Sequence, residues 1–263
     1  MLMNMKELLK VADEKGFAVP AFNIGSDQLL KAVMQQVKEM KSPVILEMSP
    51  DEFNFVENSL IQSMIYEASK TDVPVVIHLD HGDKYETVVR AIQAGFTSVM
   101  IDASKLPYEE NIAITQKVCE VAHLANVSVE SELGTIGTTG NSIEGGTIGT
   151  AHGIYPSDMK PELRLDILQT LKDTLDIPLV LHGGSSNKDE EIAKAVKIGI
   201  SKINISSDIK VAFYDKCREV LNAHPEYREP LEIYPEPIKA CREVIAHKVN
   251  LFDSADKVKY YYE

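Results

Sequence analysis

The chain has 263 residues, of which 44% are hydrophobic and 25% are charged. This composition is typical of a globular protein and excludes global disorder. Forty acidic residues outweigh 27 basic ones, and the net charge of −13 makes nucleic acid and anionic membranes unexpected partners. No apolar run reaches the roughly 18 residues of a membrane span, and the N-terminal segment lacks the order of a signal peptide, so we expect a cytoplasmic protein.

Short β-branched segments alternate along the chain with amphipathic helical patterns. Strands are predicted over residues 17–23, 43–49, 74–80, 97–102, 127–133, 147–152, 177–182 and 200–205. Helices are predicted over residues 1–16, 26–40, 58–70, 85–94, 109–125, 161–175, 189–198, 207–223 and 235–252. Continuous apolar strands that are separated by amphipathic helices favour a parallel sheet.

Eight βα units in a chain of this length predict a single (β/α)8 TIM-barrel domain over residues 1–263. The segment 235–252 adds a further C-terminal helix. The alternative is an open doubly wound sheet, which a G-x-G-x-x-G motif after the first strand would support. That strand leads into Asn-Ile-Gly-Ser-Asp-Gln instead.

The unit between predicted strands five and six is atypically short. Only residues 133–146 separate Glu132 from Thr147, and they are rich in glycine, threonine and serine. No helix is expected there, whereas a βα unit normally needs about 30 residues. Either the unit has lost its helix, or a mobile segment is absent from this sequence.

Three of the seven histidines, His81, His152 and His182, end predicted strands, and each is followed by glycine. The C-terminal ends of barrel strands converge on one mouth. Three imidazoles with one open position are a ligand set for catalytic zinc, although any single histidine could be a plain strand terminus.

Acidic residues lie at the same strand ends. Asp80 precedes His81 and could exchange a proton with a substrate oxygen, or it could only orient the histidine. Asp102, Glu130 and Glu132 could form a second cation position or orient the ligands. Clustered carboxylates are costly without a cation, so their presence also favours a metal.

Small polar residues follow predicted strands seven and eight, in the segments 182–185 and 204–207. Barrel enzymes often bind phosphate at these loops, on backbone N–H groups at a helix N-terminus. A plain loop is the alternative for each segment. Lys202, inside the last strand, is expected to point outward or to be structural.

These motifs resemble the class II, zinc-dependent ketose-bisphosphate aldolases, and the likeness is closest to the tagatose- and fructose-bisphosphate branch. The matching segments are 19–24, 42–49, 73–82 with H-L-D-H-G, 100–112, 129–134, 148–156, 177–186 with L-H-G-G-S, and 201–208. The likeness therefore extends from about residue 17 to residue 225.

The resemblance implies a reversible aldol cleavage of a ketose 1,6-bisphosphate to dihydroxyacetone phosphate and glyceraldehyde 3-phosphate. It implies zinc on His81, His152 and His182, with Asp80 as the proton donor and acceptor. It also implies a secondary metal position near Glu132 and Asp102. The implied phosphate and substrate contacts are Asn23, Ser49, Gly153, Gly183, Gly184, Ser185, Asn204, Ser206 and Ser207.

The family likeness further implies a monovalent cation, Na+ or K+, near the Gly153 and Gly183 carbonyls, and a homodimer or homotetramer. Two departures stand out. Ser186 replaces the glycine that usually follows the serine of H-G-[GA]-S. The loop after Glu132-Leu133-Gly134 carries a single acid, Glu144, which is the candidate for the enolising base.

Two other functions remain open. The chain could be a non-catalytic barrel subunit that stabilises an aldolase partner, although it retains all three histidines. It could also be another metal-dependent barrel enzyme that acts on phosphorylated sugars, such as an isomerase or a hydrolase.

Overall fold

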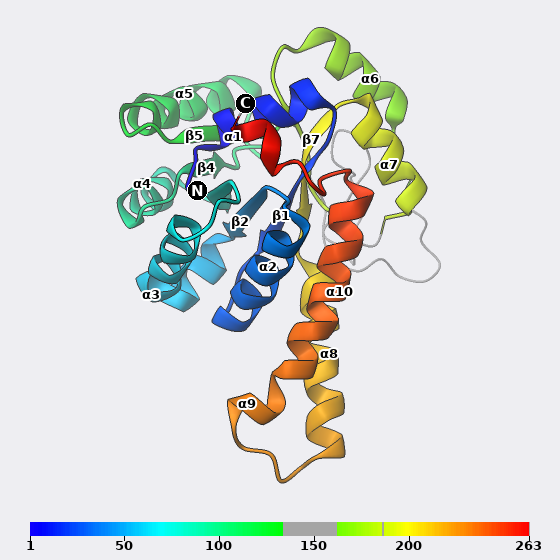
Figure 1. Ribbon diagram of the computed structural model, residues 1–263. Coiled ribbons are helices and arrows are strands. Elements are labelled where there is room, and N and C mark those ends of the chain that lie inside the picture. Colours follow the sequence, from blue (N-terminus) through cyan, green and yellow to red (C-terminus); the bar gives the residue numbers. More distant parts are fainter. Residues whose placement is uncertain (134–161, 186, 263) are drawn as a thin grey trace.

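Seven parallel strands form one sheet in the order β5-β4-β3-β2-β1-β7-β6. The structure is a computed structural model that describes residues 1–133, 162–185 and 187–262 (Figure 1). The strands are β1 Val19–Asn23, β2 Val44–Met48, β3 Val75–Gly82, β4 Ser98–Ile101, β5 Ser128–Ser131, β6 Leu179–Leu181 and β7 Ile200–Ile205.

Most helices alternate with the strands and cover the outer face of the sheet, whereas the first helix precedes the first strand (Figure 1). The helices are α1 Met5–Lys15, α2 Asp27–Met40, α3 Pro50–Ser69, α4 Tyr85–Ala94, α5 Tyr108–Leu124, α6 Leu165–Thr174, α7 Asp189–Ile198, α8 Ser207–Ala223, α9 Pro230–Ile233 and α10 Pro235–Leu251, with a final 3-10 helix at Val258–Tyr261. In the described ranges each strand prediction is confirmed to within a few residues, and the sheet is parallel as expected.

Helix α3 contains a break that agrees with the sequence pattern. The pattern predicts a helix that starts at residue 58, and the backbone of α3 leaves the helical region at Glu57, with φ 52° and ψ −152°. The part that the pattern missed is the piece before this break, which begins at Pro50. The Ser49 hydroxyl accepts a hydrogen bond from the N–H of Glu52, and the Glu52 carboxylate accepts one from the N–H of Ser49. This capping box, followed by proline at the first helical position, fixes the start of the helix.

The sheet curls so strongly that residues at its two edges meet. Glu130 belongs to β5, and His182 directly follows β6 at the other end of the strand order. Their side chains lie 2.7 Å apart, between Oε1 of Glu130 and Nε2 of His182. The predicted strand at 147–152 and the short unit before it lie outside the described residues.

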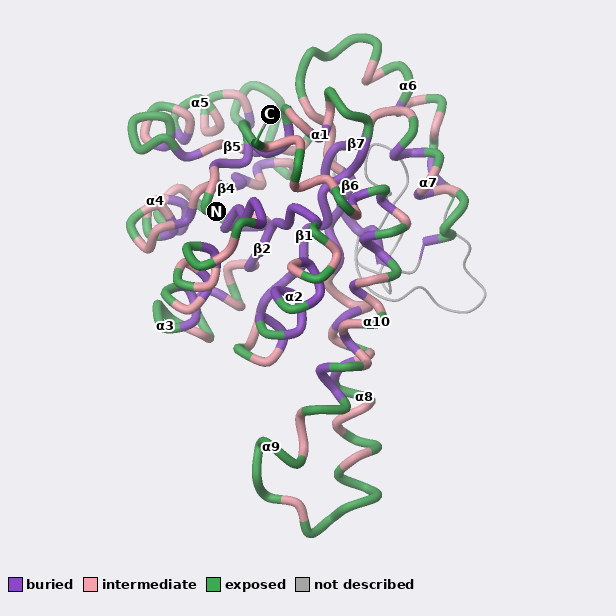
Figure 2. Tube along the Cα trace, in the orientation of Figure 1, coloured by how far each residue is buried: buried purple, intermediate pink, exposed green. Residues whose placement is uncertain are grey.

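Strand alternation divides the sheet into an inner and an outer face. On the inner face, Val19, Ala21, Ile45 and Val76 pack against α1 and close the end from which the strands start. On the outer face, residues such as Phe22 and Leu46 are fully buried under the helices. Figure 2 shows the buried residues gathered along the strands. Because α1 closes the end where the strands start, a functional site is expected at the other end of the inner face, where the strands finish.

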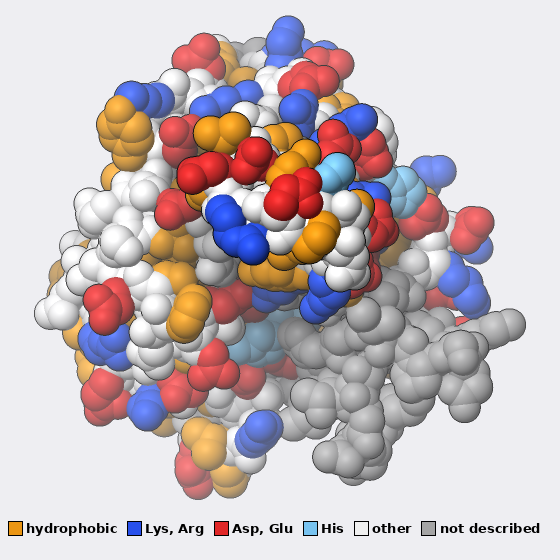
Figure 3. Space-filling model, turned by 90° about the horizontal axis from the view of Figure 1, so that it is seen from below, with side chains coloured by type: hydrophobic (Ala, Val, Ile, Leu, Met, Phe, Trp, Pro, Cys, Tyr) orange, Lys and Arg blue, Asp and Glu red, His pale blue; other side chains and the backbone are white. Residues whose placement is uncertain are grey.

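The C-terminal helices form a long hairpin. Helix α8 runs outward from the end of β7, and α10 returns beside it and packs on α2 (Figure 1). Asp208 in the first turn of α8 pairs with Lys248 of α10 at 2.7 Å. The expected C-terminal helix is thus confirmed. Seen from below in Figure 3, this end of the molecule carries intermixed acidic and basic side chains.

Among the described helices, none combines the length and the apolar character that a membrane crossing requires.

Candidate metal and phosphate site

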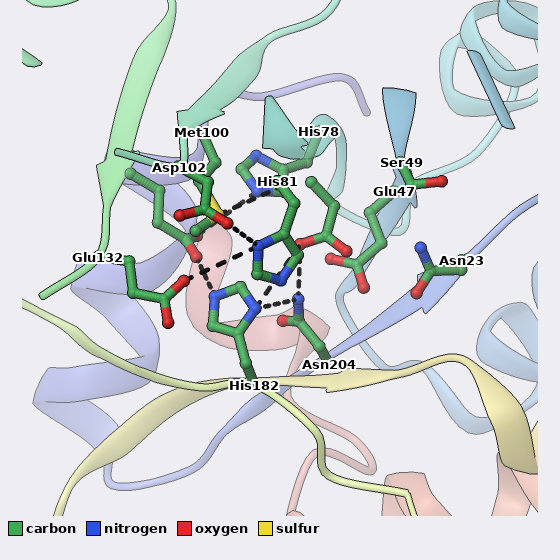
Figure 4. Close-up of polar contacts among 12 residues, drawn as sticks. Asn23, Glu47, Ser49, His78, His81, Met100, Asp102, Glu132, His182 and Asn204 are labelled. Carbon is green, nitrogen blue, oxygen red and sulfur yellow. Dashed lines mark hydrogen bonds and ion pairs between the residues drawn. The ribbon is translucent and has the colours of Figure 1, made fainter. Parts of the chain in front are cut away.

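The predicted site residues of the inner face meet where the strands end (Figure 4). Asp80 comes from β3, His182 follows β6, and Asn204 comes from β7. The amide nitrogen of Asn204 donates to Oδ1 of Asp80 at 3.0 Å and lies 3.2 Å from Nδ1 of His182. Residues that are distant in sequence therefore share one buried cluster.

His81 reaches this cluster through a local distortion of β3. Simple alternation would point it away from Asp80, its neighbour in the strand. The pairing of β3 with β4 shifts register between Leu79 and Gly82, and His81 has a φ of 48°. Such irregularities redirect a side chain and are concentrated at functional sites. Gly82 is required beside it, because a Cβ there would collide with the carbonyl oxygen of Met100.

Each of the two described site histidines is held by a carboxylate through one ring nitrogen. Nδ1 of His81 lies 2.9 Å from Oδ2 of Asp102, and Nε2 of His182 lies 2.7 Å from Oε1 of Glu130. Metal-binding histidines typically make this contact through the nitrogen that does not bind the metal. The other nitrogens, Nε2 of His81 and Nδ1 of His182, face Oδ1 of Asp80 at 3.9 and 3.7 Å.

These side chains could hold a metal ion. One ligand atom from each of Asp80, His81 and His182 lies within 4.8 Å of the other two. The two imidazole rings approach edge to face with centroids 4.7 Å apart. Nitrogen donors with carboxylate support suit zinc and related transition metals. The donor set therefore fits a catalytic metal.

A second acidic group lies on the other side of His81. Asp102, Glu132 and His81 also bring ligand atoms within 4.8 Å of one another, and Oε2 of Glu132 is 3.8 Å from Nδ1 of His81. The Asp102 carboxylate also accepts a hydrogen bond from the Ser104 hydroxyl at 2.6 Å. Asp102 and Glu132 are the two residues near which a secondary metal position was expected.

The charges and the burial of the cluster shift the pKa values of its side chains. Burial alone would lower the pKa of His81, but the hydrogen bond to Asp102 and the charge of Asp80 outweigh it and raise the pKa to about 9. Burial would raise the pKa of Asp80, but His81 and His182 lower it overall. Burial raises the pKa of Glu132 to about 7. Asp80 is therefore a carboxylate at neutral pH, next to proton donors.

A cavity of about 210 Å³ opens beside the cluster. It is lined by Asn23, Ser49, Glu52, Asp80, His81, Gly183, Ser185, Asn204, Ser206, Ser207 and Lys210. The Ser185 hydroxyl accepts a hydrogen bond from the N–H of Asp208 in the first turn of α8. Hydroxyls around a helix N-terminus suit an anionic group such as phosphate.

Most of the predicted substrate contacts are brought to this cavity. Gly184 lies behind its wall, and its N–H donates to the carbonyl oxygen of Asn204 at 3.0 Å. His152, Gly153 and Glu144 lie outside the described residues, as does Ser186.

Of the two alternatives for Lys202, outward or structural, the structural one is confirmed, because its side chain points inward. It is fully buried, with Nζ 3.0 Å from Oε2 of Glu130 and 3.5 Å from Oε2 of Glu47. Nε2 of His78 lies 3.5 Å from Oε2 of Glu130. These four residues form an interior charge layer directly beneath the site.

Alternation predicts this layer. Glu47, His78, Glu130 and Lys202 each stand two residues before a predicted site residue, namely Ser49, Asp80, Glu132 and Asn204. Residues two apart in a strand share a face. The sequence analysis did not single out Glu52 and Lys210. They come from helices, where strand alternation gives no signal.

The family model described as fructose-bisphosphate aldolase class-II matches residues 3–147 and 146–257. A probable fructose-bisphosphate aldolase of Bacillus subtilis is 35% identical, over 97% of this chain and 99% of the relative. A 6-phospho-5-dehydro-2-deoxy-D-gluconate aldolase of Bacillus licheniformis is also 35% identical, over 97% and 96%. The crystal structure of the YdjI aldolase from Escherichia coli K12 has a TM-score of 0.84 and 29% identity, over 98% and 100% of the two chains.

The alignment also bears on the short unit. The two matched segments meet at residues 146–147, within the region predicted to be short. The Bacillus subtilis alignment runs over 285 positions, 22 more than the 263 residues of this chain. That relative therefore has residues without a counterpart here. The coverage nevertheless extends over nearly the whole sequence, and the chain belongs to the class-II fructose-bisphosphate aldolase family.

Proposed function

We propose that the chain catalyses the reversible aldol cleavage of a ketose 1,6-bisphosphate, fructose or tagatose, to dihydroxyacetone phosphate and glyceraldehyde 3-phosphate. One observation carries the proposal. The two histidines and Asp80 bring ligand atoms within 4.8 Å of one another beside a cavity lined with hydroxyls. The names of the fructose- and tagatose-bisphosphate aldolase relatives support the same reaction class.

The metal of this proposal is Zn2+, held by His81, His182 and, from outside the described residues, His152. When bound, it supplies a Lewis acid that polarises the ketone carbonyl and stabilises negative charge on that oxygen. Asp102 and Glu130 keep the two described imidazoles in orientation. Glu132 and Asp102 provide a secondary metal position.

Asp80 handles the proton at the aldol oxygen. In the cleavage direction its carboxylate accepts the hydroxyl proton as the carbon–carbon bond breaks, and in synthesis it returns that proton. Asn204 fixes the carboxylate through its amide. Glu144 is our candidate for the base that exchanges the proton at the hydroxymethyl carbon.

The phosphate of dihydroxyacetone phosphate binds at the wall built from Gly183, Ser185, Asn204, Ser206 and Ser207, with Gly184 behind it. Gly153, which lies outside the described residues, is our further candidate for this wall, and Gly153 and Gly183 are the residues that would hold Na+ or K+. Asn23 and Ser49 line the part of the cavity that receives the rest of the sugar.

The proposal also covers the fold, the compartment and the oligomeric state of the whole molecule. The curled seven-stranded sheet is the greater part of a (β/α)8 barrel that forms one domain over residues 1–263, with one short unit. The protein acts in the cytoplasm as a homodimer or homotetramer.

The test combines metal content with activity. The purified protein should contain zinc and cleave fructose or tagatose 1,6-bisphosphate in an assay that couples triose-phosphate release to a dehydrogenase. Chelation should abolish cleavage, and added zinc should restore it. Full activity after complete chelation would exclude the zinc proposal. A zinc-loaded chain that cleaves neither sugar would instead favour a non-catalytic subunit.

A further inference from the structure

Two side chains of the interior charge layer, Glu47 and His78, carry buried polar atoms without a hydrogen bond close to Asp80. Both side chains are fully buried, and they are register partners on the neighbouring strands β2 and β3 (Figure 4). Within the described part of the chain, neither carboxyl oxygen of Glu47 makes a hydrogen bond, and neither does Nε2 of His78. Most buried polar atoms are satisfied by protein groups or by ordered water, so these atoms need a partner.

We propose that Glu47, His78 and Asp80 bind one ordered water molecule inside the curled sheet, and that this water fixes the plane of the Asp80 carboxylate. Glu47 and His78 are then positioning residues, which act on the reaction through Asp80. The inference rests on the proposed function for what Asp80 does, whereas the water site itself does not.

The spacing of the three residues suits a single water. One ligand atom from each of Glu47, His78 and Asp80 lies within 4.8 Å of the other two. Two partners of one tetrahedral water, each at about 2.8 Å, lie about 4.6 Å apart. One water can therefore contact all three residues, and internal waters typically have about three partners.

The donors and acceptors also match a water. Burial lowers the pKa of His78 to about 3, so its ring is neutral and carries one proton. Nδ1 lies 2.9 Å from the Ser98 hydroxyl, and Nε2 faces Oε2 of Glu130 at 3.5 Å. The proton is favoured on Nε2, because a lone pair there would face negative charge, and Nδ1 then accepts from Ser98. Nε2–H donates to the water, and the water donates its two hydrogens to Glu47 and Asp80.

A neutral ligand fits this position better than a metal ion does. Nζ of Lys202 lies 3.5 Å from Oε2 of Glu47 and repels a second cation. Burial and the charge of Asp80 raise the pKa of Glu47. The neutral acid and the carboxylate both offer an oxygen to water, so the site does not depend on the protonation of Glu47.

The water gives Asp80 a second fixed contact. Oδ1 of Asp80 accepts a hydrogen bond from the Asn204 amide at 3.0 Å. The torsion that rotates a carboxylate is broad, so one hydrogen bond does not define the plane of the group. A second hydrogen bond, from the interior, defines that plane and orients the carboxylate for the proton that it exchanges.

A high-resolution crystal structure of the zinc-loaded protein tests the water site. It should show a water within about 2.6–3.2 Å of a Glu47 oxygen, of Nε2 of His78 and of an Asp80 oxygen. Glu47→Gln retains a side-chain oxygen and should keep the water, whereas Glu47→Met should lose it. Wild-type crystals without density at this position, or with the anomalous signal of a metal there, would overturn the inference.

Cleavage kinetics test the effect on Asp80. Glu47→Met should lower kcat by about tenfold, because a misplaced reacting group slows an enzyme steeply. KM should stay unchanged, since Glu47 is absent from the described lining of the cavity. Glu47→Gln removes the same charge but should keep most of the wild-type kcat. Ile45→Val, a buried change on the same strand and face, is the matched control and should turn over as the wild type does.

Equal losses of kcat in Glu47→Gln and Glu47→Met would contradict the positioning role, as would a change confined to KM. Should Glu47→Met fail to fold, the crystal structures of the wild type and of Glu47→Gln still decide whether the water is bound. If the wild type holds the water but cleaves neither sugar, the water site stands and the proposed function fails.

Discussion

The interior charge layer and the strand-end site lie one above the other and use the same residue types, yet they balance their charges differently. In the interior layer, Lys202 lies between Glu47 and Glu130 and is fully buried with them. In the strand-end site, the acids Asp80, Asp102 and Glu132 surround His81, whose ring nitrogens lie within 4.0 Å of all three.

The difference teaches what each layer is for. A buried carboxylate needs a compensating cation. The interior layer contains its own cation, Lys202, and so needs no ligand to compensate its acids. The strand-end site relies on protonated His81 or on a bound metal, so its charge can change with ligand and pH. A structural layer thus supports a chemical one, and the following experiments separate the two.

The largest effect is expected at Asp80. Asp80→Ala should retain zinc but lower kcat by about 100- to 10,000-fold, the usual contribution of general acid–base catalysis. The coupled triose-phosphate assay measures kcat, and metal analysis checks the zinc content. Wild-type turnover in this variant would remove Asp80 from the reaction.

Lys202 should matter for stability rather than for turnover. Lys202→Met leaves Glu47 and Glu130 buried together without their cation, and this should lower the free energy of unfolding by about 3–5 kcal/mol. Urea unfolding monitored by circular dichroism measures the loss. Lys216→Met, an exposed change on α8, is the control and should cost far less. Equal losses in the two variants would mean that the interior layer is not held by its lysine.

A substitution of Asp102 tests how strongly the orientation of the His81 ring affects zinc affinity. Asp102→Asn weakens the contact that fixes the His81 ring, so zinc affinity should fall by about 10- to 100-fold. Competition with a chromogenic chelator measures the affinity. Asp215→Asn removes the same charge from the exposed surface of α8 and should leave it unchanged. An unaltered affinity in Asp102→Asn would show that the ring needs no such support.

The smallest expected effect is the release of a proton from His81 when zinc binds. With a pKa of about 9, His81 is protonated in the metal-free protein at pH 7.5, and it must lose that proton to bind zinc. Zinc binding should therefore release about one proton from His81, visible as a dependence of the calorimetric heat on the buffer. Proton release that is equal in wild type and His81→Gln would contradict this assignment.

The same shift gives the metal-free protein a pH-dependent stability. The folded-state pKa of His81 exceeds its unfolded value of about 6.5. Its contribution is therefore complete below pH 6.5 and is lost as the pH rises through about 9. Thermal unfolding across this range, compared with His81→Gln, measures that loss.

Much of the fold follows from the sequence, because β-branched runs and amphipathic helices alternate clearly. The contacts of Asp80 and His182 follow too, since parallel strands bring their C-terminal ends together. The bulge that turns His81 inward does not, because it depends on register with β4. Lys202 was expected to be outward or structural, and strand alternation, which puts it on the same face as Asn204, favours the second alternative. Glu52 and Lys210 meet across two helices, and no local pattern reports such a contact.

Helix α8 couples the cavity to a distant part of the molecule. Its first residue, Ser207, lines the cavity, and its last, Ala223, lies about 25 Å away in the hairpin at 1.5 Å per residue. A tilt of about 5° about the middle of such a rod moves its first residue by about 1 Å, a displacement that can cost an enzyme about 100-fold in rate. Phe213 of α8 is buried in the hydrophobic core and helps to hold the helix in position. Turnover can therefore be damaged by substitutions of such core residues, which never touch a substrate.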